Sequence, residues 1–241
     1  MRVALACLLG FVLVSCAAAP ASPPAASLSP AAVIPSTPTD LVATPTIAAA
    51  SPSASPDGPT PSALISEMDQ AVAAESTALV TQTWIGAQSL TKFDQGTDSK
   101  YQRPDRRQAV TMDRITGKVT TVIEIGPTRY VQVGSGAPWQ VTQPAVPYKG
   151  EITVIQSFDL APMKAGTAGR SVCPSASCFV IAGGYDLPPG GRHNVTLTID
   201  AQSHLPLQST TTNSYADGTS YTVTWLFSDW GIPMNIQAPK L

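Results

Sequence analysis

The sequence predicts a mainly β (α+β) domain, built as a large curved antiparallel sheet or a half-open barrel. Two observations favour this fold class: alternation of apolar and polar residues recurs in successive hairpins, and one amphipathic helix pattern precedes them. Long hairpins in succession with almost no helix between them are typical of a single antiparallel sheet with one face exposed to solvent. Residues 61–241, roughly 180 in number, are enough for one domain with a substantial core.

Residues 1–15 are predicted to be a lipoprotein signal peptide. Arg2 precedes an apolar run, 3–14, that is shorter than the about 20 residues a membrane-spanning helix needs. The small and aliphatic residues 13–15 before Cys16 resemble the bacterial lipobox. This resemblance implies that Cys16 receives a diacylglycerol and becomes the first mature residue. An ordinary signal peptide with an incidental cysteine is the alternative.

Residues 16–60 are predicted to be a disordered tether. The segment is rich in Ala, Pro, Ser and Thr, has no aromatic residue, and carries charge only at Asp40 and Asp57. Such a composition buries too little apolar surface to offset the entropy of ordering it. Proline-rich linkers extend by about 3 Å per residue, so this one either gives the domain reach or is a passive spacer.

The domain is predicted to begin with an amphipathic helix from Pro61 to about Ala74. Thr60 can cap this helix with its hydroxyl, and proline is favoured at the first helical position. Apolar residues such as Leu64 and Met68 recur at helical spacing. Their stripe must pack on the strands that follow.

The strands are predicted from alternating patterns between turn residues. In the first half, strands are expected at 77–89, 100–112, 120–125 and 128–133, with a polar turn at 91–98. In the second half, strands are expected at 194–200, 205–215 and 221–228. The intervening residues 143–169 are interpreted as a loop with a short helix.

Cys173 and Cys178 are predicted to form a short-loop disulfide, because a secreted protein folds in an oxidising compartment. Metal binding is the alternative, but zinc would need two more ligands, and the only histidines are His193 and His204. No metal site and no cofactor are expected.

The sequence also predicts no enzyme and no catalytic residues. His193 and His204 are interpreted as surface residues in turns, outside any nucleophile or zinc motif. Acidic residues that could be paired as catalytic carboxylates, such as Asp159 and Asp186, are interpreted as exposed charges. The net charge of −2, with 12% charged residues, shows no electrostatic footprint for nucleic acid.

Several strings resemble the LolA/LolB-like superfamily. They are YQRPDR at 101–106, EIGPTRYV at 124–131 followed by Trp139, and LTID at 197–200 with LPL at 205–207. The string FSDWGIPMNIQAP at 227–239 is similar to the C-terminal signature of LppX/LprG-type lipoproteins of the same superfamily. The similarity spans most of residues 61–241.

This resemblance implies a half-open sheet with helices covering its concave side and an apolar cavity between them that holds an acyl chain. None of the family's ligand-contacting residues can be matched to a position here. The candidates are therefore apolar residues expected on the concave face: Ile123, Ile125, Val195, Leu197, Ile199, Tyr221, Val223, Trp225 and Phe227. A filled core is the alternative for each of them.

The predicted function is a membrane-anchored envelope lipoprotein that carries or chaperones a lipid or an acylated protein. The alternative is a non-catalytic interaction or sensor module of the envelope on the same fold. Both place a monomer at the extracytoplasmic face of a bacterial membrane, held by the lipid on Cys16.

Overall fold

A computed structural model describes residues 58–88, 91–173 and 177–241. The predicted signal peptide, Cys16 and the predicted tether as far as residue 57 lie outside the described residues. The helices are α1 (Pro61–Ala74) and α2 (Ser157–Lys164). The strands are β1 (Thr77–Gln88), β2 (Thr91–Gln102), β3 (Arg106–Asp113), β4 (Lys118–Ile125), β5 (Thr128–Val133), β6 (Gln140–Thr142), β7 (Thr167–Val172), β8 (Ser177–Leu187), β9 (Gly191–Asp200), β10 (Pro206–Ser214) and β11 (Ser220–Ser228).

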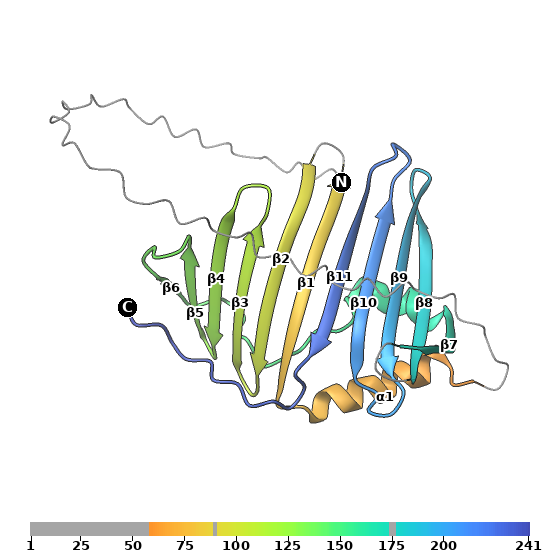
Figure 1. Ribbon diagram of the computed structural model, residues 1–241, viewed down its shortest axis with the longest axis horizontal. Coiled ribbons are helices and arrows are strands. Elements are labelled where there is room, and N and C mark those ends of the chain that lie inside the picture. The colour runs from red at the N-terminus through yellow and green to blue at the C-terminus, as the bar shows by residue number, and fades with distance from the viewer. Residues whose placement is uncertain (1–57, 89–90, 174–176) are drawn as a thin grey trace, which may run out of the picture. The chain divides into compact units, whose positions relative to one another are not determined.

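The strands form one curved, unclosed antiparallel sheet, which confirms the predicted fold class. Its 11 strands follow the order β6-β5-β4-β3-β2-β1-β11-β10-β9-β8-β7, so β1 and β11 are neighbours at its centre (Figure 1). The short strands β6 and β7 form the two edges. The β8–β9 and β10–β11 hairpin turns lie at the same end of the sheet, and α1 lies at the opposite end (Figure 1).

Helix α1 begins as the sequence predicts. The Thr60 hydroxyl accepts a hydrogen bond from the backbone N–H of Ala63 at 3.3 Å, and Pro61 occupies the first helical position. The buried residues are the apolar stripe: Leu64, Ile65, Met68 and Val72. In the described part of the chain, neither helix is long and apolar enough to cross a membrane.

The prediction of a polar turn at 91–98 is wrong. Residues 91–102 form strand β2, which pairs along its whole length with β1, from Gln88 opposite Thr91 to Thr77 opposite Gln102. The strand predicted at 100–112 is also divided, because the chain turns between β2 and β3. Polar residues such as those of β2 form strands when a neighbouring strand satisfies their backbone groups, and local propensity does not report this.

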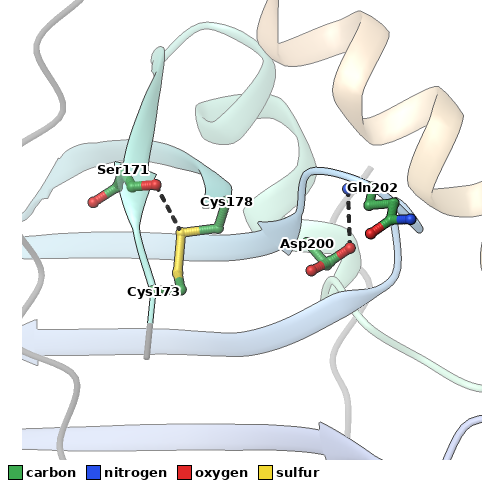
Figure 2. The surroundings of a disulfide bond; sticks show 5 residues. All are labelled: Ser171, Cys173, Cys178, Asp200 and Gln202. Atoms are coloured by element: carbon green, nitrogen blue, oxygen red, sulfur yellow. Dashed lines mark hydrogen bonds between the residues drawn. A yellow bond between two sulfur atoms is a disulfide. The ribbon is translucent and has the colours of Figure 1, made fainter. Parts of the chain in front are cut away.

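The second half of the sheet contains two strands that the sequence patterns did not indicate, β7 and β8. Strands β9, β10 and β11 lie where they were predicted, and the short helix expected within 143–169 is α2. Figure 2 shows the Cys173–Cys178 disulfide near the β9–β10 turn. Cys178 pairs with Asp200 in the β8–β9 ladder, so the disulfide lies at the start of β8 next to this turn.

One face of the sheet, here called the helix face, packs against both helices. Leu64 and Met68 of α1 and Met163 of α2 join one buried cluster with Ile181 of β8 and Leu197 of β9. These five side chains are at most 1% exposed. Because each Å² of apolar surface removed from water contributes about 25 cal/mol, this cluster is the main stabilising element of the domain.

Candidate functional site

The cavity candidates on β9 and β11 all point to the helix face. Val195 lies opposite Thr211, and Thr211 lies opposite Val223, so the three residues form one row across β9, β10 and β11. Successive side chains of a strand alternate between faces. The residues that share this face by alternation are Val195, Leu197, Ile199, Tyr221, Val223, Trp225 and Phe227.

Ile123 and Ile125 were expected on the same face, and this expectation is wrong. Ile123 lies opposite Gln108 of β3. The same row of residues continues across the sheet through Lys100 and Leu79 to Ser228. Ser228 follows Phe227, so this row lies on the opposite face. The alternation within β4 separates its two faces correctly, but only the register across neighbouring strands determines which face the helices cover.

Beneath the helices, the candidate residues are packed as a core. Val195, Leu197, Ile199 and Phe227 belong to the same buried cluster as the apolar residues of α1, and none is more than 5% exposed. The filled-core alternative therefore describes these four residues. Tyr221 and Trp225 are only half-buried.

Across β2, β3 and β4, the helix face is largely polar. Gln95, Thr97 and Ser99 share it with Thr111 and Thr120, in ladders continuous with Trp84 and Val80 of β1. The hydroxyls of Thr97 and Thr111 are 3.0 Å apart and hydrogen-bonded. The helix face is thus more polar in this half of the sheet, where Tyr101, Ala109 and Val122 are among its apolar residues.

An aromatic cluster lies on the helix face near the hairpin end of the sheet. The Trp84 and Phe93 rings stack with centroids 4.7 Å apart, and Tyr221 contacts both at 5.9 and 6.3 Å. Tyr215 extends the group, with its ring 6.2 Å from that of Tyr221. We call these four residues the aromatic cluster. All are half-buried, and offset or edge-to-face geometry at these distances is favourable.

Gly86 makes room for this arrangement. Its φ is +135°, and a Cβ there would clash with the backbone of Ser220 and Tyr221. Only glycine tolerates such a conformation and such a close approach.

Burial, and next the hydrogen bond with Tyr215, raises the pKa of Tyr221 to about 12, so this phenol stays neutral at physiological pH.

A pocket of about 260 Å³ opens beside the aromatic cluster. Tyr215 belongs to both, and the pocket is bounded by the ends of β1, of the β8–β9 hairpin and of the β10–β11 hairpin. Its lining residues are Gln88, Pro188, Pro189, Gly191, Tyr215, Ala216 and Asp217. Its volume is slightly below the about 300–1,000 Å³ typical of small-ligand pockets, so it can hold only part of a lipid.

A buried polar network lies next to this site, and the sequence interpretation missed it. His193 and Asp159 were expected at the surface, but each is only 2% exposed. His193 Nε2 lies 2.6 Å from Asp159 Oδ1, and His193 Nδ1 lies 2.8 Å from Asn213 Oδ1. The Thr211 hydroxyl donates to Asp159 Oδ2 at 3.2 Å. We call these four residues the Asp159–His193 network.

The sequence contained one usable signal for this network. His193 begins the alternation that continues through Val195, Leu197 and Ile199 on β9, so it belongs to the buried row. Its partner Asp159 comes from α2, and no local pattern places that helix. His204 does lie in a turn and is partly exposed, as predicted.

The remaining predicted site features are simple to place. The Cys173–Cys178 disulfide is present, with Cα atoms 5.9 Å apart. Among the described residues, no group of three or more His, Cys, Asp or Glu side chains is arranged to hold a metal ion. The Asp186 carboxylate, by contrast with that of Asp159, is exposed and pairs with Arg192 at 2.7 Å.

Comparison with known proteins gives structural neighbours only. No family model matches the chain, and no curated protein matches it. Lipoprotein LppX from Mycobacterium tuberculosis aligns at 17% identity and a TM-score of 0.49, covering 73% of this chain and 97% of LppX. LprF from Mycobacterium bovis aligns at 19% identity and a TM-score of 0.49, covering 78% of this chain and 99% of LprF.

A LolA superfamily protein from Nitrosomonas europaea aligns at 8% identity and a TM-score of 0.32, covering 74% of this chain and 96% of that protein. LppX and the LolA superfamily are also the names that the sequence resemblance indicated.

Proposed function

We propose that this chain is a non-catalytic carrier that binds an acyl chain of a lipid or of an acylated protein at the aromatic cluster and its adjoining pocket. The observation that carries the proposal is the continuity of these two features. Trp84, Phe93 and Tyr221 form a half-buried apolar surface that leads through Tyr215 into an open pocket. The ligand would lie there and not between the helices and the sheet, where the core is filled.

Such a site needs no catalysis, because burial of the acyl chain supplies the free energy of binding. Moving one methylene out of water contributes about 0.8 kcal/mol, so about eight methylenes on the cluster would contribute roughly 6 kcal/mol before ordering costs. Rigid aromatic rings lose little conformational entropy when a ligand covers them. The indole N–H of Trp84 is buried and has no hydrogen-bond partner among the described residues, and a ligand oxygen that reached it would satisfy this donor.

The proposal includes a location. A diacylglycerol on Cys16 would hold the domain at the extracytoplasmic face of a bacterial membrane, and residues 17–60 would let it reach away from that surface. The domain would act there as a monomer and without a cofactor.

Quenching by a brominated fatty acid tests the proposal directly, because bromine quenches tryptophan on contact. The full chain with Cys16→Ser, which carries no anchor lipid, should lose tryptophan fluorescence when brominated palmitate is added. Trp84→Phe should remove most of that quenching, whereas Trp139→Phe, beyond β5, should leave it intact. No quenching, or an equal loss in both variants, would overturn the proposal.

A second candidate function, an interaction or sensor module without a lipid, is favoured by one observation. The interior between α1 and the sheet is tightly packed, with Leu64 and Leu197 at most 1% exposed. Native mass spectrometry of the Cys16→Ser chain purified from bacterial envelopes separates the two functions. A co-purifying acyl species supports the carrier, and the mass of the chain alone supports the module.

A further inference from the structure

We propose that the helix face holds a second binding site, which takes a phosphate group at Arg103, Arg107 and Arg129. We call these three residues the arginine cluster. Among the described residues, Glu124 is the one carboxylate that forms ion pairs with them. The site goes beyond the proposed function, because it depends on charge and hydrogen-bond donors and not on an apolar surface.

The arginine cluster lies near the α1 end of the sheet. One row on the helix face crosses β2, β3, β4 and β5 and contains two of its arginines; in order, the row is Tyr101, Arg107, Glu124 and Arg129. Arg103 follows directly after β2, whose last residue lies opposite the first residue of β1. Figure 1 shows α1 at this end of the strands.

This position separates the arginine cluster from the proposed acyl-chain site. Tyr101 lies six positions beyond Gln95 on β2, and Gln95 lies opposite Trp84 of the aromatic cluster. At a rise of about 3.3 Å per residue, the two sites are about 20 Å apart along the sheet. Binding at one site therefore does not require direct contact with the other.

The positive charge of the arginine cluster is not balanced by the described residues. Arg107 Nε lies 3.0 Å from Glu124 Oε2, and Arg129 Nε lies 3.8 Å from Glu124 Oε1, so two guanidinium groups share one carboxylate. Arg103 forms no ion pair with a described residue, and its Nη2 donates a hydrogen bond to the Val72 carbonyl at 3.1 Å. Three guanidinium groups and one carboxylate leave a charge of +2.

The tyrosine packed against this group adds no negative charge. The Tyr148 ring centroid lies 5.7 Å from Arg107 Cζ and 6.4 Å from the Tyr101 ring centroid. Burial, and next the neighbouring Tyr101, raises the pKa of Tyr148, so this phenol is neutral at physiological pH. Its ring also lowers the local dielectric constant beside Arg107, which strengthens the attraction between the guanidinium and an anion.

Hydrogen-bond donors of the arginine cluster are also unsatisfied. The Nε atoms of all three arginines are buried and have no hydrogen-bond partner among the described residues. The side chains of Arg107 and Arg129 are 31% and 42% exposed, so an anion can approach them from solvent. Arg114 and Arg192, by contrast, each pair with a carboxylate of their own, at 3.1 and 2.7 Å. Unpaired donors and charges are costly when partly buried, so a bound anion would stabilise the cluster.

A phosphate group matches both the charge and the donors. The planar N–H groups of a guanidinium match two phosphate oxygens, and the remaining oxygens can accept hydrogen bonds from a second arginine. A phosphate monoester carries a charge of about −1.5 to −2 at neutral pH, close to the excess on the cluster, whereas a carboxylate carries a single charge. A lipid headgroup and inorganic phosphate share this chemistry.

Titration of the full chain carrying Cys16→Ser with inorganic phosphate, at constant ionic strength, tests the site. The NMR signals of the Nε–H groups of Arg107 and Arg129 should shift on addition of phosphate. Calorimetry should show that Arg107→Gln raises the dissociation constant at least about tenfold. Arg114→Gln, which removes an arginine paired with Asp94, is the matched control and should change it less than about twofold.

Glu124→Gln should act in the opposite direction. Because it removes the carboxylate that competes for Arg107 and Arg129, it should lower the dissociation constant at least about threefold. This second variant keeps the test decisive if Arg107→Gln does not fold. Absence of phosphate binding, or equal effects of Arg107→Gln and Arg114→Gln, would overturn the site.

Dihexanoyl phosphatidic acid, a short-chain lipid with a phosphate monoester, distinguishes the two sources of the phosphate. At least about tenfold tighter binding than that of inorganic phosphate would assign the site to a lipid headgroup, and equal affinity would assign it to free phosphate. Absence of quenching by brominated palmitate would overturn the proposed acyl-chain function but would leave the phosphate site intact, so the two failures are distinguishable.

Discussion

The packing of Leu197 decides whether the space beneath the helices is filled, and Leu197→Ala tests it. Leu197 is fully buried, at 0% exposure, in the cluster that joins α1, α2 and the sheet. Truncation to alanine removes about three carbons, equivalent to roughly 2.4 kcal/mol of lost transfer free energy at about 0.8 kcal/mol per methylene. In a filled core the new cavity adds to this cost, so we expect a total of about 3–4 kcal/mol.

Urea unfolding followed by circular dichroism measures this difference. At a slope of about 2 kcal/mol per molar urea, the unfolding midpoint should fall by about 1.5–2 M, with the slope unchanged. Ile85→Ala is the control, because Ile85 lies on β1 but is 51% exposed, and it should cost less than about 1 kcal/mol. If Leu197→Ala cost no more than this control, Leu197 would border a vacancy, and the filled-core reasoning would be refuted.

Three further predictions concern the rest of the domain. Replacing both Cys173 and Cys178 by serine should lower the free energy of unfolding by about 2 kcal/mol, as expected for a loop with a sequence separation of 5. Thermal unfolding under non-reducing conditions measures this change. An unchanged unfolding midpoint would mean that the disulfide does not restrict the unfolded chain. Hydrogen bonds from the backbone N–H of Ser203 and neighbouring groups lower the pKa of Asp200, and Figure 2 shows the contact with Gln202. The carboxylate therefore stabilises the fold above the ordinary aspartate pKa of about 3.9, and this stabilisation is lost as pH falls through the lowered pKa. Asp200→Asn should therefore unfold more easily than the parent at pH 7, with the difference closing in acid; a gap that persists at low pH would exclude the carboxylate as its cause. Ile236→Ala should lower the free energy of unfolding by about 2–4 kcal/mol, because Ile236 is 1% exposed. The same change at its exposed neighbour Gln237 is the control. Equal effects of the two changes in urea titrations would show that the C-terminal segment is not anchored at Ile236.

The C-terminal segment illustrates a long-range contact that no local pattern reports. The Ile236 carbonyl accepts a hydrogen bond from Arg106 at 2.8 Å, and its N–H donates to the Gln102 side chain at 3.1 Å. These residues are separated by 130 and 134 positions in sequence. The segment from residue 227 was recognised by its resemblance to lipoproteins, but its attachment to β2 and β3 depends on the folded sheet.

The errors in the strand predictions have a common cause. The segment 91–98 is polar enough to suggest a turn, yet β2 forms because β1 provides a full-length partner. The apolar pattern of Ile123 and Ile125 was recognised correctly, but their face was not. A period of two separates the faces of a strand without identifying which face the core covers, and a shift of one residue in register exchanges them.

Sequence patterns alone were sufficient to predict the class of fold, the position of α1 with its Thr60 cap, and the pairing of Cys173 with Cys178. These features depend on neighbours within a few positions or on the composition of a segment, which a linear chain displays directly. The folded structure was needed to show that Leu197 is core, that Asp159 and His193 are in contact, and that aromatic residues from β1, β2 and β11 form one cluster. Such contacts join strands and helices far apart in sequence, and their energies depend on burial and register, which exist only once the sheet has formed.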